Sequence, residues 1–204
     1  MKPPEVVVFD LGKVLVDFDY SIAARKIAAR SAVTAPEIQQ FIEHSPLLYR
    51  FETGQLTVEQ FFEEVREAAQ YRGTFEEFTA YFADIFTEMP SMTQLHAQLR
   101  EREIPTFIFS NTNELAITHI RRNFPFFAQF TDYILSYEHG AMKPEPKLYE
   151  VVEARTGRRG NQILYLDDRT ENITAGAARG WQTILQASPE KSRQQVANAG
   201  LLPA

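Results

Sequence analysis

Three short apolar runs constrain the fold of this chain more than any other feature of its sequence. They cover residues 6–9, 106–109 and 163–166, and each ends abruptly at small or acidic side chains: Asp10, Ser110-Asn111 and Asp167-Asp168. Short apolar runs rich in β-branched and aromatic residues are typical of strands buried on both faces of a parallel sheet. Helical patterns separate the runs, so we predict an α/β fold, a parallel sheet flanked by helices. Such sheets bind ligands at the carboxyl ends of their strands, where these polar side chains would meet.

Beyond residue 90 the chain continues to alternate between strand and helix patterns. We predict strands at 133–135 and 181–186, helices at 91–102 and 114–123, a helix that opens within 143–147 and runs to 155, a helix that reaches Gly180, and a polar helix in the tail. Residues 10–19 are predicted to form a loop after the first strand.

Residues 20–89 have a different character, which indicates a helical insertion. Three threonines are each followed three residues later by an acid or amide, the capping-box pattern of a helix start: Thr34 with Glu37, Thr57 with Gln60, and Thr74 with Glu77. Apolar side chains recur at helical spacing after these starts, as expected for the core of a small bundle. We therefore predict a core domain of residues 1–19 and 90–204 and a helical cap domain of residues 20–89.

Composition excludes several classes of function. The chain has 204 residues, 44% of them hydrophobic, and a net charge of -6, which argues against general affinity for nucleic acid or an anionic membrane. It contains no cysteine, so it has no disulfide, thiol nucleophile or thiolate metal site. The apolar run at 6–9 is too short for a signal peptide or membrane span. We expect a cytoplasmic protein, either a monomer or a homodimer.

The polar residues at the strand ends have a joint chemical interpretation, although each also has a plainer one. Asp10 and Ser110 could each cap the following helix, and Lys143 could be an ordinary solvated lysine in a proline-rich loop. The adjacent carboxylates Asp167 and Asp168 repel each other, and a divalent cation relieves that repulsion. Together the residues suit phosphoryl transfer, in which Asp10 attacks phosphorus, Ser110 binds phosphate oxygens, Lys143 balances negative charge, and the acid pair holds Mg²⁺.

Four stretches in this order carry a resemblance to a known family. They are Phe9-Asp-Leu-Gly-Lys-Val-Leu-Val-Asp17, Phe109-Ser-Asn-Thr-Asn113, Gly140-Ala-Met-Lys-Pro-Glu-Pro146 and Tyr165-Leu-Asp-Asp-Arg-Thr-Glu-Asn172. They resemble the four motifs of the haloacid dehalogenase (HAD) superfamily, and the insertion after the first is similar to the cap of its first subclass. The residues within these motifs are most similar to those of the family branch that contains α-D-glucose-1-phosphate phosphatase and the phosphatase domain of soluble epoxide hydrolase. The resemblance implies a Rossmann-like core and a phosphatase that acts through an aspartyl-phosphate.

The resemblance also implies roles for individual residues. Asp10 would be the nucleophile and a Mg²⁺ ligand, and Gly12 would offer its backbone carbonyl to the metal. Asp168 would be the other protein ligand, with Asp167 and Asn172 at or near the coordination shell. The phosphate would bind to Ser110, to the backbone of Asn111 and to Lys143, which would also steady Asp10.

The first motif departs from the usual family pattern at one position. Most family phosphatases carry a second aspartate two residues after the nucleophile as general acid and base, and here that residue is Gly12. Members of the glucose-1-phosphate phosphatase branch share this gap. Lys13 and Asp17 are the candidates nearest in sequence for the missing acid. Without a strong acid, leaving groups that depart readily as anions would be favoured.

These observations predict a Mg²⁺-dependent phosphatase for a small phosphorylated metabolite, such as a hexose 1-phosphate. The cap would select the substrate, and Arg50, between two cap helices, could contact a sugar or a second anion; it could equally be part of an ordinary helix end before Gly54. One alternative is a 2-haloacid dehalogenase that uses the same aspartate without metal. Another is a binding protein that kept the fold and lost turnover.

Overall fold

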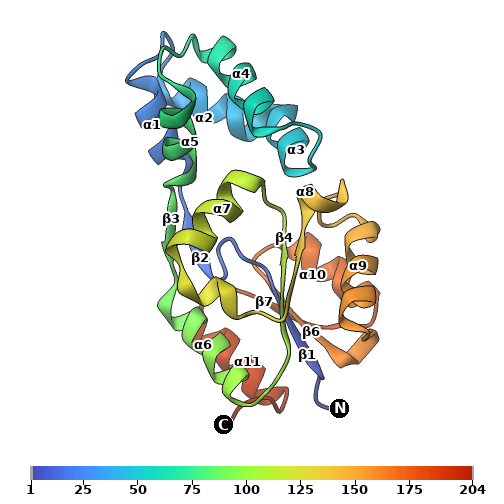
Figure 1. Cartoon of the computed structure of the whole chain (residues 1–204). Coiled ribbons are helices and arrows are strands. Elements are labelled where there is room, and N and C mark those ends of the chain that lie inside the picture. Colours follow the sequence, from blue (N-terminus) through green and yellow to red (C-terminus); the bar gives the residue numbers. More distant parts are fainter. Residues whose placement is uncertain (1, 204) are drawn as a thin grey trace.

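The computed structural model describes residues 2–203 and contains a five-stranded parallel sheet in the order β5-β4-β1-β6-β7 (Figure 1). The strands are β1 (Val6–Phe9), β4 (Thr106–Ser110), β5 (Asp132–Leu135), β6 (Ile163–Asp167) and β7 (Gln182–Leu185). In the register, Val8 of β1 lies beside Phe107 of β4 and Tyr165 of β6. The three apolar runs are therefore the three central strands, and the predicted α/β fold with a Rossmann-like parallel sheet is confirmed.

Helices cover both faces of this sheet. They are α6 (Pro90–Glu101), α7 (Glu114–Asn123), α8 (Ser136–His139), α9 (Pro146–Thr156), α10 (Thr170–Ala178) and α11 (Pro189–Asn198), with short 3-10 turns η1 (Pro125–Gln129) and η2 (Gly160–Gln162). Side chains alternate along β1, so Val7 and Phe9 join one apolar cluster while Val6 and Val8 join another on the opposite face. All four side chains are nearly inaccessible to solvent, and burying each one contributes about 1.5–3 kcal/mol to stability. This two-sided burial is why β1 lacks the polar alternation of a half-exposed strand.

The prediction of a loop throughout residues 10–19 is wrong. Residues 16–18 form strand β2 (Val16–Phe18), which pairs antiparallel with β3 (Phe86–Glu88). A three-residue strand is too short to show a period, and its partner lies about seventy positions along the chain, so only the long-range pairing defines it. The β2–β3 ribbon carries the chain from the core to the inserted helices and back (Figure 1).

The inserted segment is helical, as predicted, and contains α1 (Tyr20–Ala28), α2 (Ala35–His44), α3 (Pro46–Glu52), α4 (Val58–Ala69) and α5 (Phe75–Ala83). The placement of Arg50 between two cap helices is wrong, because this residue lies within α3. They share an apolar cluster of their own, with Phe61 and Phe78 fully buried in it. Figure 1 shows them gathered beyond the end of the sheet that lies away from the N-terminus. The division into a core of residues 1–19 and 90–204 and a cap of residues 20–89 remains a prediction. We refer to α1–α5 as the cap.

Local capping explains where these helices begin. The capping box is complete at Thr57 and at Thr74, where each hydroxyl accepts from the N–H three residues on. At Thr34 the arrangement differs, because the hydroxyl and the N–H both donate to the Glu37 carboxylate. The three predicted helix starts are confirmed. No helix within residues 2–203 is both long and apolar enough to cross a membrane.

The cap touches the core where α3 ends. Gly54 follows α3 with a φ of +68°, and a Cβ at this position would lie 2.2 Å from the backbone oxygen of Tyr137 in α8. Only glycine tolerates both the left-handed conformation and this close approach. The turn after α3 is thereby seated against the core, close to the carboxyl end of the sheet.

Candidate active site

The carboxyl ends of β1, β4 and β6 bring three polar side chains to one edge of the sheet. β1 lies between the other two strands, so Asp10 follows it with Ser110 on one side and Asp167 on the other. All three side chains are buried. Carboxylate oxygens of Asp10, Asp167 and Asp168 come within 4.8 Å of one another. The residues predicted to converge from distant parts of the sequence therefore do so.

Lys143 places its ammonium group at the centre of this site. Its Nζ lies 2.9 Å from Asp10 Oδ1 and donates to Asp167 Oδ2 at 2.7 Å and to the backbone oxygen of Phe109 at 2.9 Å. The side chain is 1% exposed. The three N–H donors of the ammonium thus meet three acceptors, and the lysine is an internal countercharge rather than a solvated surface residue.

The ionised side chains of this site are buried, and burial disfavours their charged forms. Burial raises the pKa of Asp10 to about 7, although Lys143 opposes the shift. Burial acts on Asp167 in the same direction, but Lys143 and the surrounding donors outweigh it and hold the pKa of Asp167 below its usual value. The two carboxylates likewise raise the pKa of Lys143 against the effect of its own burial.

Asp10 keeps one carboxylate oxygen available for chemistry. Oδ1 accepts from the Leu11 N–H at 2.7 Å and faces Lys143, which fixes the orientation of the group. Within residues 2–203 no hydrogen bond is made to Oδ2. An oriented, buried carboxylate with a free oxygen can act as a nucleophile or a metal ligand.

The two acids after β6 differ sharply in their surroundings. Asp167 accepts from the Tyr165 hydroxyl, from Asn172 Nδ2 at 3.0 Å and from the Arg169 N–H at 2.8 Å, in addition to Lys143. Asp168 is half-buried, and no side chain of residues 2–203 donates to its carboxylate. Burial and the neighbouring Asp167 raise the pKa of Asp168. A divalent cation suits this charge cluster, in which Asp10 and Asp168 can each offer a carboxylate oxygen while Asp167 and Asn172 stand behind them.

The second predicted motif contributes the buried Ser110 hydroxyl and the Asn111 side chain, which makes two hydrogen bonds to the backbone of Lys143. The Ser110 side chain lies at the end of β4, and its Oγ donates to the Asn111 carbonyl at 3.3 Å. The Asn111 amide accepts from the Lys143 N–H at 2.7 Å and donates to the Lys143 carbonyl at 3.0 Å. The Asn111 side chain therefore positions the backbone of the lysine, a role that the sequence reasoning did not foresee. The backbone of Asn111 remains the predicted phosphate-binding group.

A cavity lies between the core and the cap, beside Gly12 and Ser110. It is lined by Leu11, Gly12, Val16, Phe18, Tyr20, Glu52, Phe86, Ser110, Asn111, Thr112, Asn113, Ala116 and Ile120. Glu52 is the only acidic side chain in this lining. Its carboxyl group is buried, and burial together with the charge of Asp10 raises its pKa to about 7. Glu52 and Tyr20 are the cap residues in this lining, and the sequence reasoning missed both.

Arg50, the cap residue chosen from the sequence, does not line this cavity. Its guanidinium pairs with Glu64 of α4 at 2.9 Å, and its side chain is 39% exposed. Side chains two residues apart on a helix point to nearly opposite sides. Within α3, Arg50 therefore points away from the cavity and Glu52 points into it. The helical spacing was the signal that could have identified Glu52.

Lys13 and Asp17, considered from the sequence as replacements for the missing acid, pair with each other, Lys13 from the loop before β2 and Asp17 from β2 itself. Both side chains are largely exposed, and neither lines the cavity. Their geometry makes them a surface ion pair.

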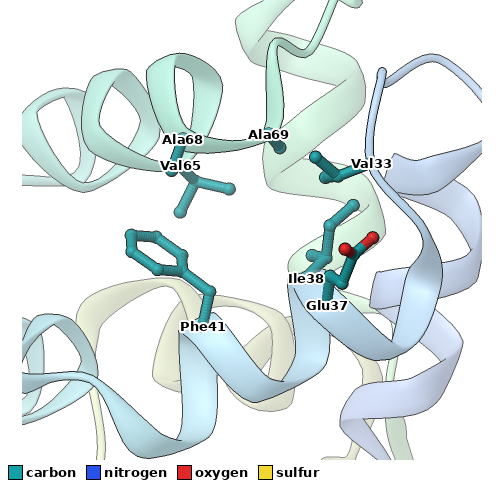
Figure 2. Close-up of a pocket in the computed structure, with 7 residues that line it drawn as sticks. All are labelled: Val33, Glu37, Ile38, Phe41, Val65, Ala68 and Ala69. Atoms are coloured by element: carbon teal, nitrogen blue, oxygen red, sulfur yellow. The ribbon is translucent and has the colours of Figure 1, made fainter.

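A second cleft opens between α2 and α4 of the cap (Figure 2). Figure 2 shows Phe41 and Val65 facing each other across it, with Glu37 at its edge. Glu37 is already used by the Thr34 cap. None of the residues that line this cleft belongs to the site described above, and the cleft offers no nucleophile.

Comparison with known proteins places this arrangement in a family. The family model for haloacid dehalogenase-like hydrolases matches residues 4–180. A D-ribitol-5-phosphate phosphatase of Bacteroides thetaiotaomicron is 22% identical over 93% of this chain and 95% of its own. Acyl-CoA dehydrogenase family member 10 of Mus musculus is 26% identical over 93% of this chain, which spans only 18% of that protein.

Solved structures share the fold of this chain. A HAD family enzyme of Bacteroides thetaiotaomicron has a TM-score of 0.80 at 23% identity, covering 90% of this chain and 93% of its own. An L-2-haloacid dehalogenase from Xanthobacter autotrophicus has a TM-score of 0.64 at 18% identity, covering 98% and 85%. These likenesses concern the fold. With the family model matching most of its length, the chain belongs to the haloacid dehalogenase-like hydrolases.

Proposed function

We propose that this protein is a Mg²⁺-dependent phosphatase that hydrolyses a small phosphorylated metabolite through an aspartyl-phosphate on Asp10. The observation that carries the proposal is the oriented Asp10 carboxylate, held by Leu11 N–H and Lys143 with Oδ2 free, beside the available carboxylate of Asp168. The phosphatase relative and a HAD family enzyme solved in complex with magnesium and inorganic phosphate support it.

Each residue has a defined part in this reaction. Asp10 Oδ2 attacks phosphorus, while Lys143 favours the ionised form of the buried carboxylate and faces the transferred group. Ser110 Oγ and the Asn111 backbone bind phosphate oxygens. Asp10, Asp168 and the Gly12 carbonyl would hold Mg²⁺, with Asp167 and Asn172 behind them; when bound, the cation neutralises phosphate charge and polarises a phosphoryl oxygen.

The substrate class follows from the enclosure of the site. The cavity between cap and core is lined partly by polar groups and partly by aromatic side chains, which suits a small polar metabolite rather than a phosphoprotein. A sugar or sugar-alcohol phosphate, either a hexose 1-phosphate or a pentitol phosphate like that named for the relative, is the class we propose.

The test uses p-nitrophenyl phosphate and a panel of sugar and polyol phosphates, with Mg²⁺ or with chelator. We expect hydrolysis that chelation stops and that Asp10→Asn abolishes. Phosphate release that continues after exhaustive chelation would contradict the metal-dependent mechanism.

The dehalogenase alternative has its own assay. That chemistry needs no cation, and an unneutralised Asp168 beside Asp10 and Asp167 would repel a carboxylate substrate. Halide release from 2-chloropropionate in the presence of chelator would favour the dehalogenase, and absence of turnover on every substrate would favour a binding protein.

A further inference from the structure

A side chain at residue 12, the position of the usual general acid, would require the Phe18 ring to shift. A Cβ built on Gly12 would lie 2.8 Å from the Phe18 ring, which packs edge-on against Tyr20 with the ring centroids 5.5 Å apart. The ring thus occupies the space that a side chain on residue 12 would need. An acid that serves this site must come from another part of the chain.

Glu52 is an acid from another part of the chain that reaches the cavity beside Gly12. It comes from α3 of the cap and lines the same cavity as Gly12 and Ser110. The residue is 9% exposed, and within residues 2–203 its carboxyl group makes no hydrogen bond and no ion pair. The Glu52 carboxyl group is therefore unpaired at the cavity, where a bound ligand can reach it and exchange a proton with it.

We propose that Glu52 is the general acid and base of the phosphatase, replacing the aspartate that is absent at Gly12. The assignment rests on the proposed function. In the first step Asp10 Oδ2 forms a bond to phosphorus, the ester P–O bond breaks with its electron pair on the leaving oxygen, and the Glu52 carboxyl gives that oxygen its proton. In the second step a water oxygen bonds to the phosphorus of the aspartyl-phosphate and gives a proton to Glu52, and the bond between phosphorus and Asp10 Oδ2 breaks with its electron pair on the carboxylate, which releases inorganic phosphate.

The charged and titratable groups around Glu52 fit this cycle. Asp10, from the core, disfavours the ionised form of Glu52, whereas Lys143 and Arg169 favour it, and the partly buried Tyr20 lies on the cap side. A carboxyl group poised between these influences can give up a proton in one step and recover it in the next. Placing the acid on the cap also means that proton transfer requires the cap to be seated on the core.

The experiment compares Glu52→Gln with the wild-type protein on two kinds of ester, in the presence of Mg²⁺. The first is p-nitrophenyl phosphate, whose leaving group departs as a stable anion, followed by stopped-flow absorbance. The second is the alkyl phosphate that the wild-type protein hydrolyses best in a panel that includes D-ribitol 5-phosphate. Glu63→Gln, which removes an exposed cap carboxylate paired with Arg66, is the matched control.

For Glu52→Gln with p-nitrophenyl phosphate we expect a burst of about one p-nitrophenolate per site, at a rate within about threefold of the wild-type first turnover. The steady state should then be at least about 100-fold slower, since the second step lacks its base. With the alkyl phosphate the first turnover itself should slow by about 100-fold or more. Glu63→Gln should match the wild-type protein on both esters.

Three outcomes would overturn the proposal. In the first, Glu52→Gln turns over both esters at the wild-type rate; in the second, it loses the p-nitrophenolate burst together with the steady state. Either result would show that Glu52 does not transfer the proton. The phosphatase function would still stand, provided that Asp10→Asn is inactive. If the wild-type protein hydrolyses no phosphate ester, the proposed function fails and the assignment of Glu52 fails with it. Circular dichroism spectra and melting temperatures establish that the variants are folded, and Glu52→Asp, which keeps the carboxyl group, should retain part of the alkyl phosphatase activity.

Discussion

Replacing Lys143 by methionine tests how this site carries its charge. The ammonium group is 1% exposed and lies 2.9 Å from Asp10 and 2.7 Å from Asp167, whose side chains are 10% and 0% exposed. Methionine is similar in length but leaves two buried carboxylates without their cation. Removing one partner of a buried ion pair costs about 3–5 kcal/mol. For a protein of this size that corresponds to a fall in melting temperature of about 6–20 °C.

The effect should depend on pH and on metal. Without Lys143 the pKa of Asp10 rises further above its unfolded value, and the pKa of Asp167 rises as well. A raised carboxyl pKa contributes stability that is lost as pH rises, so the deficit of the Lys143→Met variant should be larger at pH 8 than at pH 5. Saturating Mg²⁺ should recover part of the deficit, because it binds the folded carboxylate cluster.

Urea unfolding in chelator, followed by circular dichroism, measures the deficit. Lys26→Met is the control, since Lys26 pairs with Asp84 on the surface with exposures of 37% and 67%. That surface pair should contribute less than about 1 kcal/mol. A Lys143→Met variant as stable as the Lys26→Met control at pH 8 would refute the description of Lys143 as a buried countercharge.

Two further predictions follow from other contacts. Gly12→Asp should not raise turnover, because the new side chain meets the Phe18 ring. The overpacking should lower the free energy of unfolding, measured by thermal unfolding, by about 1–3 kcal/mol. A more active variant with an unchanged melting temperature would contradict this. His96 stacks on Phe130 with ring centroids 3.8 Å apart, and burial lowers its pKa from 6.5 to about 4. Because the folded protein holds this ring neutral, its contribution to stability is complete above about pH 6.5 and is lost as pH falls towards 4. Over that window the free energy of unfolding of the wild-type protein, measured in urea, should fall by up to about 3 kcal/mol more than that of His96→Gln. Parallel pH profiles of the two proteins would contradict this.

The sequence alone was sufficient wherever the physical signal was local. The apolar runs identified β1, β4 and β6 because burial on both faces leaves no polar alternation. The cap helices could be located from Thr34, Thr57 and Thr74, because a capping box satisfies backbone N–H groups within a single turn. The convergence of Asp10 and Asp167 also followed, since parallel strands place their carboxyl ends at one edge.

Only the tertiary structure decided which side chains face the site from the cap, and what each core residue contacts. The sequence favoured Arg50 because it is charged and lies near Gly54, but the rotation of α3 turns it towards Glu64 and turns Glu52 towards the cavity. The role of Asn111 in holding the Lys143 backbone depends on a contact across thirty-two positions of the chain. Such facts depend on how helices and loops dock against the sheet, and docking is set by packing over the whole molecule, whereas propensity and pattern act over a few residues.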